Sequence, residues 1–392
     1  MFAAGQSAER GESVLLLEKT DQVGKKLRIT GNGRCNITNT ADIEKFIESY
    51  GKNGKFMYRA LTEFFNNDLL EFFKKLGIEF QAERDGKVYP VKDNATTITD
   101  ALIKYLKTSN VKIKYSTCVE EIVLEENLSH EKGKGKFRVT GIKTADEIIE
   151  CRKVILATGG MSYPETGSTG DGYEIAKKAG HTIVAPQPAL VPLYSDEPYI
   201  KDLQGVSLYN VRLASYSGSK KIGSETGDLL FTHFGISGPA ALILSSDIVD
   251  CLKKKEFVSV SIGFQPGKNQ KSISGMLREV MPAKFMHVFL SKAGIQPGRK
   301  YGSLNRDEKT RFDALVSDFR INITGTMPIE SGIITRGGVS LKEINPYTME
   351  SKLVDELFFC GELIDIDGKT GGYNLQLAFS TAYLSAGLCQ IV

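Results

Sequence analysis

Glycine is unevenly distributed along this chain of 392 residues, and its clustering limits the possible folds more than any other feature. Three segments are rich in glycine, at residues 24–33, 159–172 and 332–372. The 39 glycines make up about 10% of the chain, against roughly 7% in average proteins. Because glycine adopts backbone conformations that other residues avoid, such clusters indicate places where the backbone turns sharply or approaches another group closely. A collagen-like or disordered chain would repeat or spread its glycine, so both classes are excluded.

The charge and the hydropathy pattern exclude two further classes. Lys and Arg number 50 and Asp and Glu 47, a net charge of +3, which lacks the basic excess of a dedicated nucleic-acid binder. No apolar run approaches the ~20 residues of a membrane span, and the N-terminus lacks the pattern of a signal peptide. We therefore expect a cytoplasmic protein with neither a nucleic-acid partner nor a membrane span.

The cysteines and histidines show no pattern of metal binding. The six cysteines include no C-x-x-C pair, and the four histidines lie far apart. Neither a zinc site nor a disulfide framework is predicted, which agrees with a reducing compartment.

Helices alternate with short apolar strands at both ends of the chain, which predicts an α/β nucleotide-binding domain. A helix from Met1 to Arg10 and a buried strand over residues 14–17 form the second half of a βαβ unit. The first half, a strand with a G-x-G-x-x-G turn, is not in the sequence. We expect it to precede Met1 in the natural protein; the alternative is that this chain lacks the strand. Further buried strands are expected at residues 154–157 and 357–360.

A proline-rich stretch before residue 193 and a change of pattern at Gly332 indicate domain boundaries. We expect residues 1–191 and 333–392 to form one domain, interrupted by an inserted domain of residues 192–332. A helix of residues 171–179 and a C-terminal helix of residues 372–388 complete the first domain.

The first glycine-rich segment is typical of a loop that binds an anion. Glu18 precedes it, at the end of a strand, where a carboxylate accepts hydrogen bonds from a ribose diol; an ordinary acid at a strand end is the alternative. Backbone N–H groups and cations of the loop can line a phosphate or an anionic ring. We expect Cys35 to pack in the loop, since no second cysteine is near. The candidate binding residues are Arg28, Gly31, Asn32, Gly33, Arg34, Cys35 and Asn36.

The second and third segments follow apolar strands, as a cofactor-binding turn does. Glycine there lets the backbone approach a cofactor, and the helix that begins near Gly372 directs unpaired N–H groups and a positive dipole end at an anion or a carbonyl. The candidate residues are Thr158, Gly159 and Gly160 in the second segment, and Gly361, Glu362, Asp365, Gly372, Asn374, Leu375 and Gln376 in the third.

These segments, in this order, resemble the BaiN/YhiN-like family of FAD-dependent, NAD(P)H-linked oxidoreductases, which belongs to the glutathione-reductase-like flavoproteins. The resemblance rests on GNGRCNITN at residues 31–39, GELIDIDGKTGGYNLQ at 361–376 and GDLLFTHFGISGP at 227–239. It covers essentially the whole chain. It implies a glutathione-reductase-like FAD-binding Rossmann domain with an inserted mixed β/α substrate domain.

The resemblance also implies roles for single residues. Glu18 would bind the adenosine ribose, residues 31–36 would run along the flavin and pyrophosphate, and Val119 would contact adenine through its backbone. Residues 158–160 would support the cofactor, Asp365 would lie near the ribityl chain or pyrophosphate, and residues 372–376 would lie at the flavin carbonyl edge. Without the G-x-G-x-x-G turn, the sequence as written is expected to bind FAD poorly.

The activity implied by the resemblance is reduction of a C=C bond conjugated to the 3-keto group of a bile-acid intermediate. Hydride would pass from NAD(P)H through FAD to the β-carbon of the enone, and an acid would protonate the α-carbon. Tyr373 and His233 are the candidate proton donors; the alternatives are that Tyr373 only packs and that His233 is an ordinary loop or core histidine. A flavoprotein acting on RNA and a cofactor-free remnant of the family are the alternatives.

Overall fold

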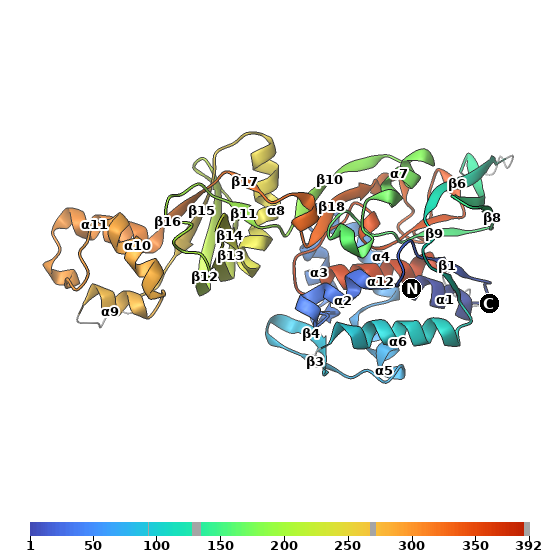
Figure 1. The fold of residues 1–392 in the computed structure, drawn as a ribbon, viewed down its shortest axis with the longest axis horizontal. Coiled ribbons are helices and arrows are strands. Elements are labelled where there is room, and N and C mark those ends of the chain that lie inside the picture. Colours follow the sequence, from blue (N-terminus) through green and yellow to red (C-terminus); the bar gives the residue numbers. More distant parts are fainter. Residues whose placement is uncertain (93, 128–134, 267–271, 388–392) are drawn as a thin grey trace. The chain divides into compact units, whose positions relative to one another are not determined.

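The computed structural model describes residues 1–92, 94–127, 135–266 and 272–387. The chain divides into two compact units (Figure 1). Unit 1 comprises Met1–Gln187 and Ile334–Val392, and unit 2 comprises Pro188–Ile333. No helix of the described residues is long and apolar enough to cross a membrane.

Unit 1 contains two pairs of parallel strands. β1 (Leu15–Leu17) pairs with β5 (Lys112–Lys114), and β9 (Val154–Leu156) pairs with β20 (Leu357–Phe359). The helices α1 (Phe2–Glu9), α7 (Asp171–Lys178) and α12 (Tyr373–Ser385) accompany these strands, as in Rossmann-type units. The expected α/β class is thus confirmed. The last residues expected in the C-terminal helix, from 388 on, lie outside the described residues.

Smaller sheets and helices complete unit 1. β6, β7, β8 and β19 form one sheet, β2, β4 and β3 form another, and β10 pairs with β18. The remaining elements are α2 (Lys25–Ile29), β2 (Thr38–Asn39), α3 (Ile43–Ser49), α4 (Tyr58–Glu63), α5 (Asn66–Lys75), β3 (Phe80–Ala82), β4 (Lys87–Pro90), α6 (Ala95–Thr108), β6 (Val119–Glu126), β7 (Phe137–Thr144), β8 (Ile148–Glu150), β10 (Ile183–Ala189), β18 (Ile334–Val339) and β19 (Val354–Asp355).

The N-terminal helix of unit 1 is anchored by aromatic packing. Phe2 is buried, and its ring centroid lies 5.1 Å from that of Phe64, 4.9 Å from that of Phe72 and 5.2 Å from that of Phe379. These rings come from segments far apart in the sequence. The contacts therefore fix the start of the chain against the C-terminal helix α12.

Unit 2 is built on a seven-stranded antiparallel sheet in the order β16-β15-β12-β13-β14-β11-β17. The helix α8 packs on β12 and β13, and three more helices lie between β15 and β16 in the sequence. The elements are β11 (Leu193–Tyr194), β12 (Ser207–Ser217), β13 (Lys220–Phe231), β14 (Gly235–Ser237), α8 (Pro239–Lys253), β15 (Val258–Gly263), α9 (Ile273–Arg278), α10 (Ala283–Ala293), α11 (Arg306–Ser317), β16 (Phe319–Ile323) and β17 (Gly325–Thr326).

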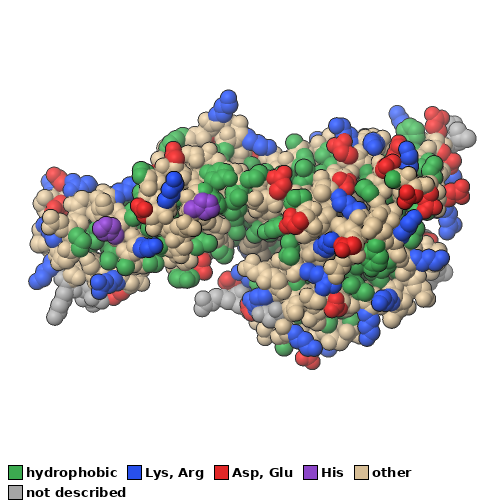
Figure 2. Space-filling view, in the orientation of Figure 1, with side chains coloured by type: hydrophobic (Ala, Val, Ile, Leu, Met, Phe, Trp, Pro, Cys, Tyr) green, Lys and Arg blue, Asp and Glu red, His purple; other side chains and the backbone are tan. Residues whose placement is uncertain are grey.

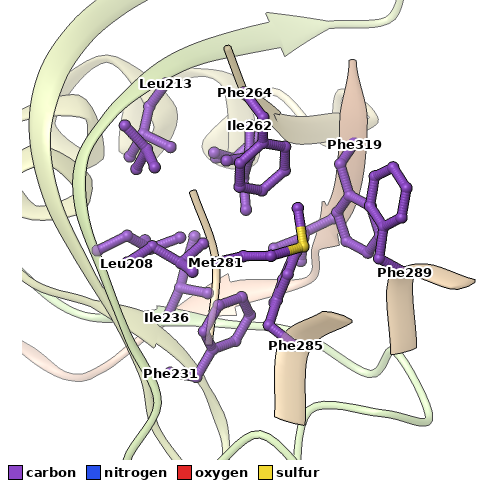
Figure 3. Packing of buried hydrophobic residues seen from close by; sticks show 14 of the residues in the cluster. Leu208, Leu213, Phe231, Ile236, Ile262, Phe264, Met281, Phe285, Phe289 and Phe319 are labelled. Atoms are coloured by element: carbon purple, nitrogen blue, oxygen red, sulfur yellow. The ribbon is translucent and has the colours of Figure 1, made fainter. Parts of the chain in front are cut away.

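A hydrophobic cluster rich in phenylalanine joins the three helices α9–α11 to this sheet (Figure 3), and α9 contributes Ile273 and Leu277 to it. Phe285 on α10 is fully buried. Its ring centroid lies 5.5 Å from that of Phe231 and 5.0 Å from that of Phe319, both on strands. Burial of these rings is the main interaction that holds α10 on the sheet.

Replacement of this central ring should destabilise unit 2. Phe285→Ala leaves a cavity in the core, and we expect the free energy of unfolding to fall by about 3–5 kcal/mol. Urea-induced unfolding followed by circular dichroism measures the change. Phe257→Ala is the matched control, because Phe257 is 65% exposed; equal losses for the two variants would contradict the assigned core.

Candidate functional site

One lysine brings the three glycine-rich segments of unit 1 together. Lys26, on α2 in the first segment, donates from Nζ to Ser162 Oγ at 2.7 Å in the second segment. The same ammonium donates to Glu362 Oε2 at 2.7 Å in the third. The side chains of Lys26 and Glu362 are 23% and 20% exposed, so the pair is largely shielded from water.

The second oxygen of this carboxylate is also occupied. Glu362 Oε1 accepts a hydrogen bond from the backbone N–H of Thr335 at 2.7 Å and from the Ser162 hydroxyl at 3.2 Å. Thr335 Oγ1 in turn accepts from the N–H of Met161 at 2.7 Å. Glu362 therefore connects backbone segments of the protein, and the polyol contact expected for it would have to replace one of these bonds.

A second set of bonds joins the first segment to the start of α12. The Thr38 hydroxyl donates to Gln376 Oε1 at 2.6 Å, and Asn39 Nδ2 donates to the carbonyl of Gly371 at 3.0 Å. Gln376 is fully buried, and its Nε2 donates to Ser380 Oγ. The Gln376 side chain is thus used within the protein.

The turn before α12 requires glycine for a steric reason. Gly372 has φ +93°, and a Cβ at this position would lie 2.2 Å from the Thr38 carbonyl oxygen. The close approach is therefore between two backbone segments. Asn374 accepts from the N–H of Gly368 and donates back to the Gly368 carbonyl, both at 2.8 Å, which orders the preceding loop. Leu375 packs against a hydrophobic cluster of unit 1.

Gly33, in the first segment, faces open space. Gly33 has φ +82°, and no atom lies within 4 Å of the position that its Cβ would take. Its neighbours Gly31 and Asn32 are exposed and also have positive φ. This exposed turn leaves room for a ligand beside the backbone.

The ends of the parallel strands carry further predicted residues. Thr158, after β9, is exposed, and Gly160 lies so close to Thr335 that a Cβ would approach its Oγ1 to 2.4 Å. Glu18 follows β1, and its Oε1 accepts from the N–H of Thr20 at 2.8 Å. A Cβ at Gly167 would lie 3.9 Å from that oxygen, so the second glycine-rich segment passes close to Glu18.

Gly159 lies three residues beyond the end of β9 and Gly361 two residues beyond the end of β20, and both have positive φ. Nucleotides bind at the carboxyl ends of strands in folds of this kind. Asp365 lies beyond Gly361 and is half-buried; burial raises the pKa of its carboxyl above the usual value, although Asn53 beside it opposes that shift. Val119, the first residue of β6, is half-buried as well.

The two predicted arginines of the first segment contact protein groups. Arg28 forms an ion pair with Asp100 at 3.1 Å. Arg34 pairs with Glu83 at 2.5 Å, and its guanidinium lies 4.1 Å from the centroid of the Tyr89 ring. These contacts hold the loop to neighbouring elements.

Cys35 and Asn36, which follow Arg34, also form contacts within the protein. Asn36 Oδ1 accepts from the N–H of Val88 at 3.1 Å. Cys35 is fully buried, and burial raises the pKa of its thiol to about 12. A thiol that stays protonated at neutral pH is unreactive, in agreement with a packing role.

The candidate proton donors lie in different units. Tyr373 belongs to unit 1 and is buried, with its ring centroid 4.8 Å from that of Phe46; its carbonyl accepts from the Tyr50 hydroxyl at 2.8 Å. His233 is exposed in unit 2 and packs edge-on against Phe234. Their catalytic role remains a prediction.

Sequence reasoning missed the residues that join the segments, namely Lys26, Ser162 and Thr335. Lys26 stands beside Lys25 in a polar loop, and nothing in that pattern distinguishes one lysine from the other. The partners of Lys26, Ser162 and Glu362, lie 136 and 336 residues away along the chain. Lys25 begins the short helix α2 and Lys26 is its second residue, so the start of the helix does not single out Lys26 either.

Comparison with protein families matches residues 1–388 to the family described as HI0933-like protein Rossmann domain. A 3-dehydro-bile acid delta(4,6)-reductase from Clostridium scindens is 29% identical over 97% of this chain and 94% of its own length. A ribosomal RNA dihydrouridine synthase from Escherichia coli is also 29% identical, over 98% of this chain and 94% of its own length.

Among solved structures, 3-ketosteroid delta1-dehydrogenase from Sterolibacterium denitrificans, in complex with 1,4-androstadiene-3,17-dione, is similar in fold. The TM-score is 0.53 at 11% sequence identity, and the match covers 98% of this chain and 96% of that one. Together with the family match, this likeness confirms a Rossmann-type FAD-binding fold.

Removal of the joining lysine should weaken unit 1. Lys26→Met leaves Glu362 and Ser162 without their shared donor, and we expect a loss of about 1–3 kcal/mol in the free energy of unfolding. Urea unfolding measures it. Lys25→Met is the control, because the partner of Lys25, Asp21, has an 80% exposed side chain. A shifted urea midpoint in the control and none in Lys26→Met would refute the assignment.

Proposed function

The chain belongs to the HI0933-like Rossmann family, and on this premise we propose that it is a flavin-dependent reductase of a C=C bond conjugated to a carbonyl group, with FAD as cofactor and NAD(P)H as electron donor. The observation that carries the proposal is the meeting of three glycine-rich segments next to the carboxyl ends of β1, β9 and β20. The two curated relatives support the reaction class, since the name of each describes reduction of a conjugated C=C bond.

The described residues fit an extended dinucleotide. Glu18 at the end of β1 would bind the adenosine ribose, and the open turn around Gly33 would lie along the pyrophosphate and flavin. The N-terminal end of α12 carries a positive dipole, which favours negative charge beside it. Bound FAD would supply hydride to the β-carbon of the substrate. The α-carbon would take a proton from Tyr373, His233 or water.

A hydrophobic enone is the first substrate candidate, and by resemblance it is a 3-oxo-Δ4,6 bile-acid intermediate. The name of the Clostridium scindens relative supports it. In such a substrate the 3-keto group accepts charge as hydride adds, so a site that stabilises the resulting enolate accelerates the reaction.

Uridine in ribosomal RNA is the second candidate, and the name of the Escherichia coli relative favours it. The C5=C6 bond of uracil is conjugated to the C4 carbonyl, so hydride addition at C6 and protonation at C5 repeat the chemistry of enone reduction. The same flavin site could reduce the conjugated bond of either substrate. The two functions would differ in the region of the protein that binds the rest of the substrate molecule.

The exposed turn of the first segment gives a direct test of cofactor binding. Gly33→Leu places a side chain where no protein atom lies within 4 Å, so it should collide with the cofactor and weaken FAD binding at least tenfold. Gly51→Leu is the control, because Gly51 also has positive φ and open space. Titration of flavin fluorescence measures the affinity for FAD. Equal affinities of the two variants for FAD would contradict the assignment of Gly33 to the cofactor site.

The two substrate candidates are separated by one assay with two arms. The protein, with FAD added in excess because binding is expected to be weak, is supplied with NADH or NADPH and either a steroidal 4,6-dien-3-one or ribosomal RNA transcribed in vitro. Mass spectrometry of the steroid, or of the nucleosides after digestion, detects the gain of two hydrogens. Reduction of the steroid alone supports the first candidate, and reduction of uridine alone supports the second. Flavin that NAD(P)H reduces without turnover of either substrate contradicts both.

A further inference from the structure

Unit 2 contains a cavity of about 690 Å³ that the flavin site does not use. It lies where β12 and β13 meet the end of β15 and the segment after α9. Phe264 and Met281 line it on the side of the phenylalanine core (Figure 3). Its volume is that of a site for one small molecule or one nucleotide.

A β-bulge at the rim of this cavity displays an aromatic ring. Leu208 pairs with Leu229 and Val211 with Gly227, so Tyr209 and Asn210 together face one residue of β13. Asn210 has φ +50°, and its N–H donates to Asp228 Oδ1 at 2.9 Å. Tyr209 is 74% exposed although it lines the cavity. Bulges of this kind redirect side chains next to binding sites.

Two arginines line the same cavity. Arg212 on β12 and Arg278 at the end of α9 are both exposed, and within the described part of the chain neither forms an ion pair. Glu279 is the one acid among the lining residues. Guanidinium groups bind phosphate through two parallel hydrogen bonds, so the lining favours an anion.

The other walls favour a nucleotide over a steroid. A steroid needs a continuous apolar surface, whereas this cavity carries hydroxyls and amides on several sides, from Ser207, Asn210, Thr226 and Gln265. A nucleobase can stack on the Tyr209 ring and bond to the amides, while its phosphate meets the arginines.

The segment that supplies residues 265 and 278–282 of the lining is rich in positive charge. Residues 265–317 contain ten Lys and Arg against four Asp and Glu. Figure 2 shows Lys and Arg side chains spread over this helical part of unit 2. Among them Lys284, Lys300 and Arg306 are exposed. Such a surface attracts the backbone of a polyanion.

We propose that this cavity binds one nucleotide of an unpaired RNA segment, with the base on Tyr209 and the phosphate on Arg212 and Arg278. The inference rests on the second substrate candidate and assigns the residues that would recognise it. It requires no electron transfer, so its test is separate from that of the flavin reaction.

The test is binding of a fluorescent, unpaired RNA 12-mer to the FAD-loaded full chain without NAD(P)H, followed by anisotropy. Tyr209→Ala, Arg212→Ala and Arg278→Ala should each weaken binding about tenfold. Tyr347→Ala and Arg152→Ala are the matched controls, because both residues are exposed and lie in unit 1. Circular dichroism melting verifies that all variants fold.

Competition identifies the ligand. Uridine 5′-monophosphate should displace the RNA at high concentration, and cholate, a steroid carboxylate, should not. Absence of RNA binding, equal binding by the cavity variants and the controls, or displacement by cholate alone would each overturn the proposal. Because the assay measures binding only, such a failure would leave the proposed reduction of a conjugated bond intact, and failure of that reduction would leave RNA binding measurable.

Discussion

The ion pair between Lys26 and Glu362 is the constraint on which the arrangement of unit 1 depends. It joins residues 336 positions apart, from the two parts of the chain that flank unit 2. Both charged groups are largely shielded, so each would be costly to leave without its partner. The Ser162 hydroxyl bonds to both, which ties in the second glycine-rich segment. These bonds fix the positions of the strand ends relative to one another, and with them Glu18, Thr158 and Gly361.

The sequence predicts the elements of unit 1 well where the signal is local. Apolar runs that end at a glycine or an acid mark β1, β9 and β20, and the strands lie within one residue of the expected positions. The Gly-Gly turn predicts the start of α12, which begins at Tyr373. These signals are strong because buried parallel strands are short and uniformly apolar, and because glycine adopts the left-handed conformation of Gly372 without steric cost.

The role of each polar residue in the glycine-rich segments could not be predicted in the same way. Glu362 and Gln376 have the residue types of cofactor ligands, yet their side chains bond to Lys26, Thr335, Thr38 and Ser380. The sequence of a loop shows which of its side chains are polar. It does not show which residues from distant parts of the chain will form hydrogen bonds with them. Gly33 differs from these residues because its surroundings are open, which only the fold reveals.

The net charge of the whole chain is a poor guide to the charge of its individual segments. A net charge of +3 over 392 residues suggests no affinity for nucleic acid, but the segment 265–317 alone has six more basic than acidic residues. The β-bulge that exposes Tyr209 follows from one extra residue in a strand pairing, which leaves no mark in composition or periodicity. A domain inserted into a flavoprotein can therefore acquire a separate recognition surface while the average properties of the chain stay those of a neutral enzyme. In the function that we propose, flavin chemistry would set the bond that is reduced, and unit 2 would select the molecule that presents that bond.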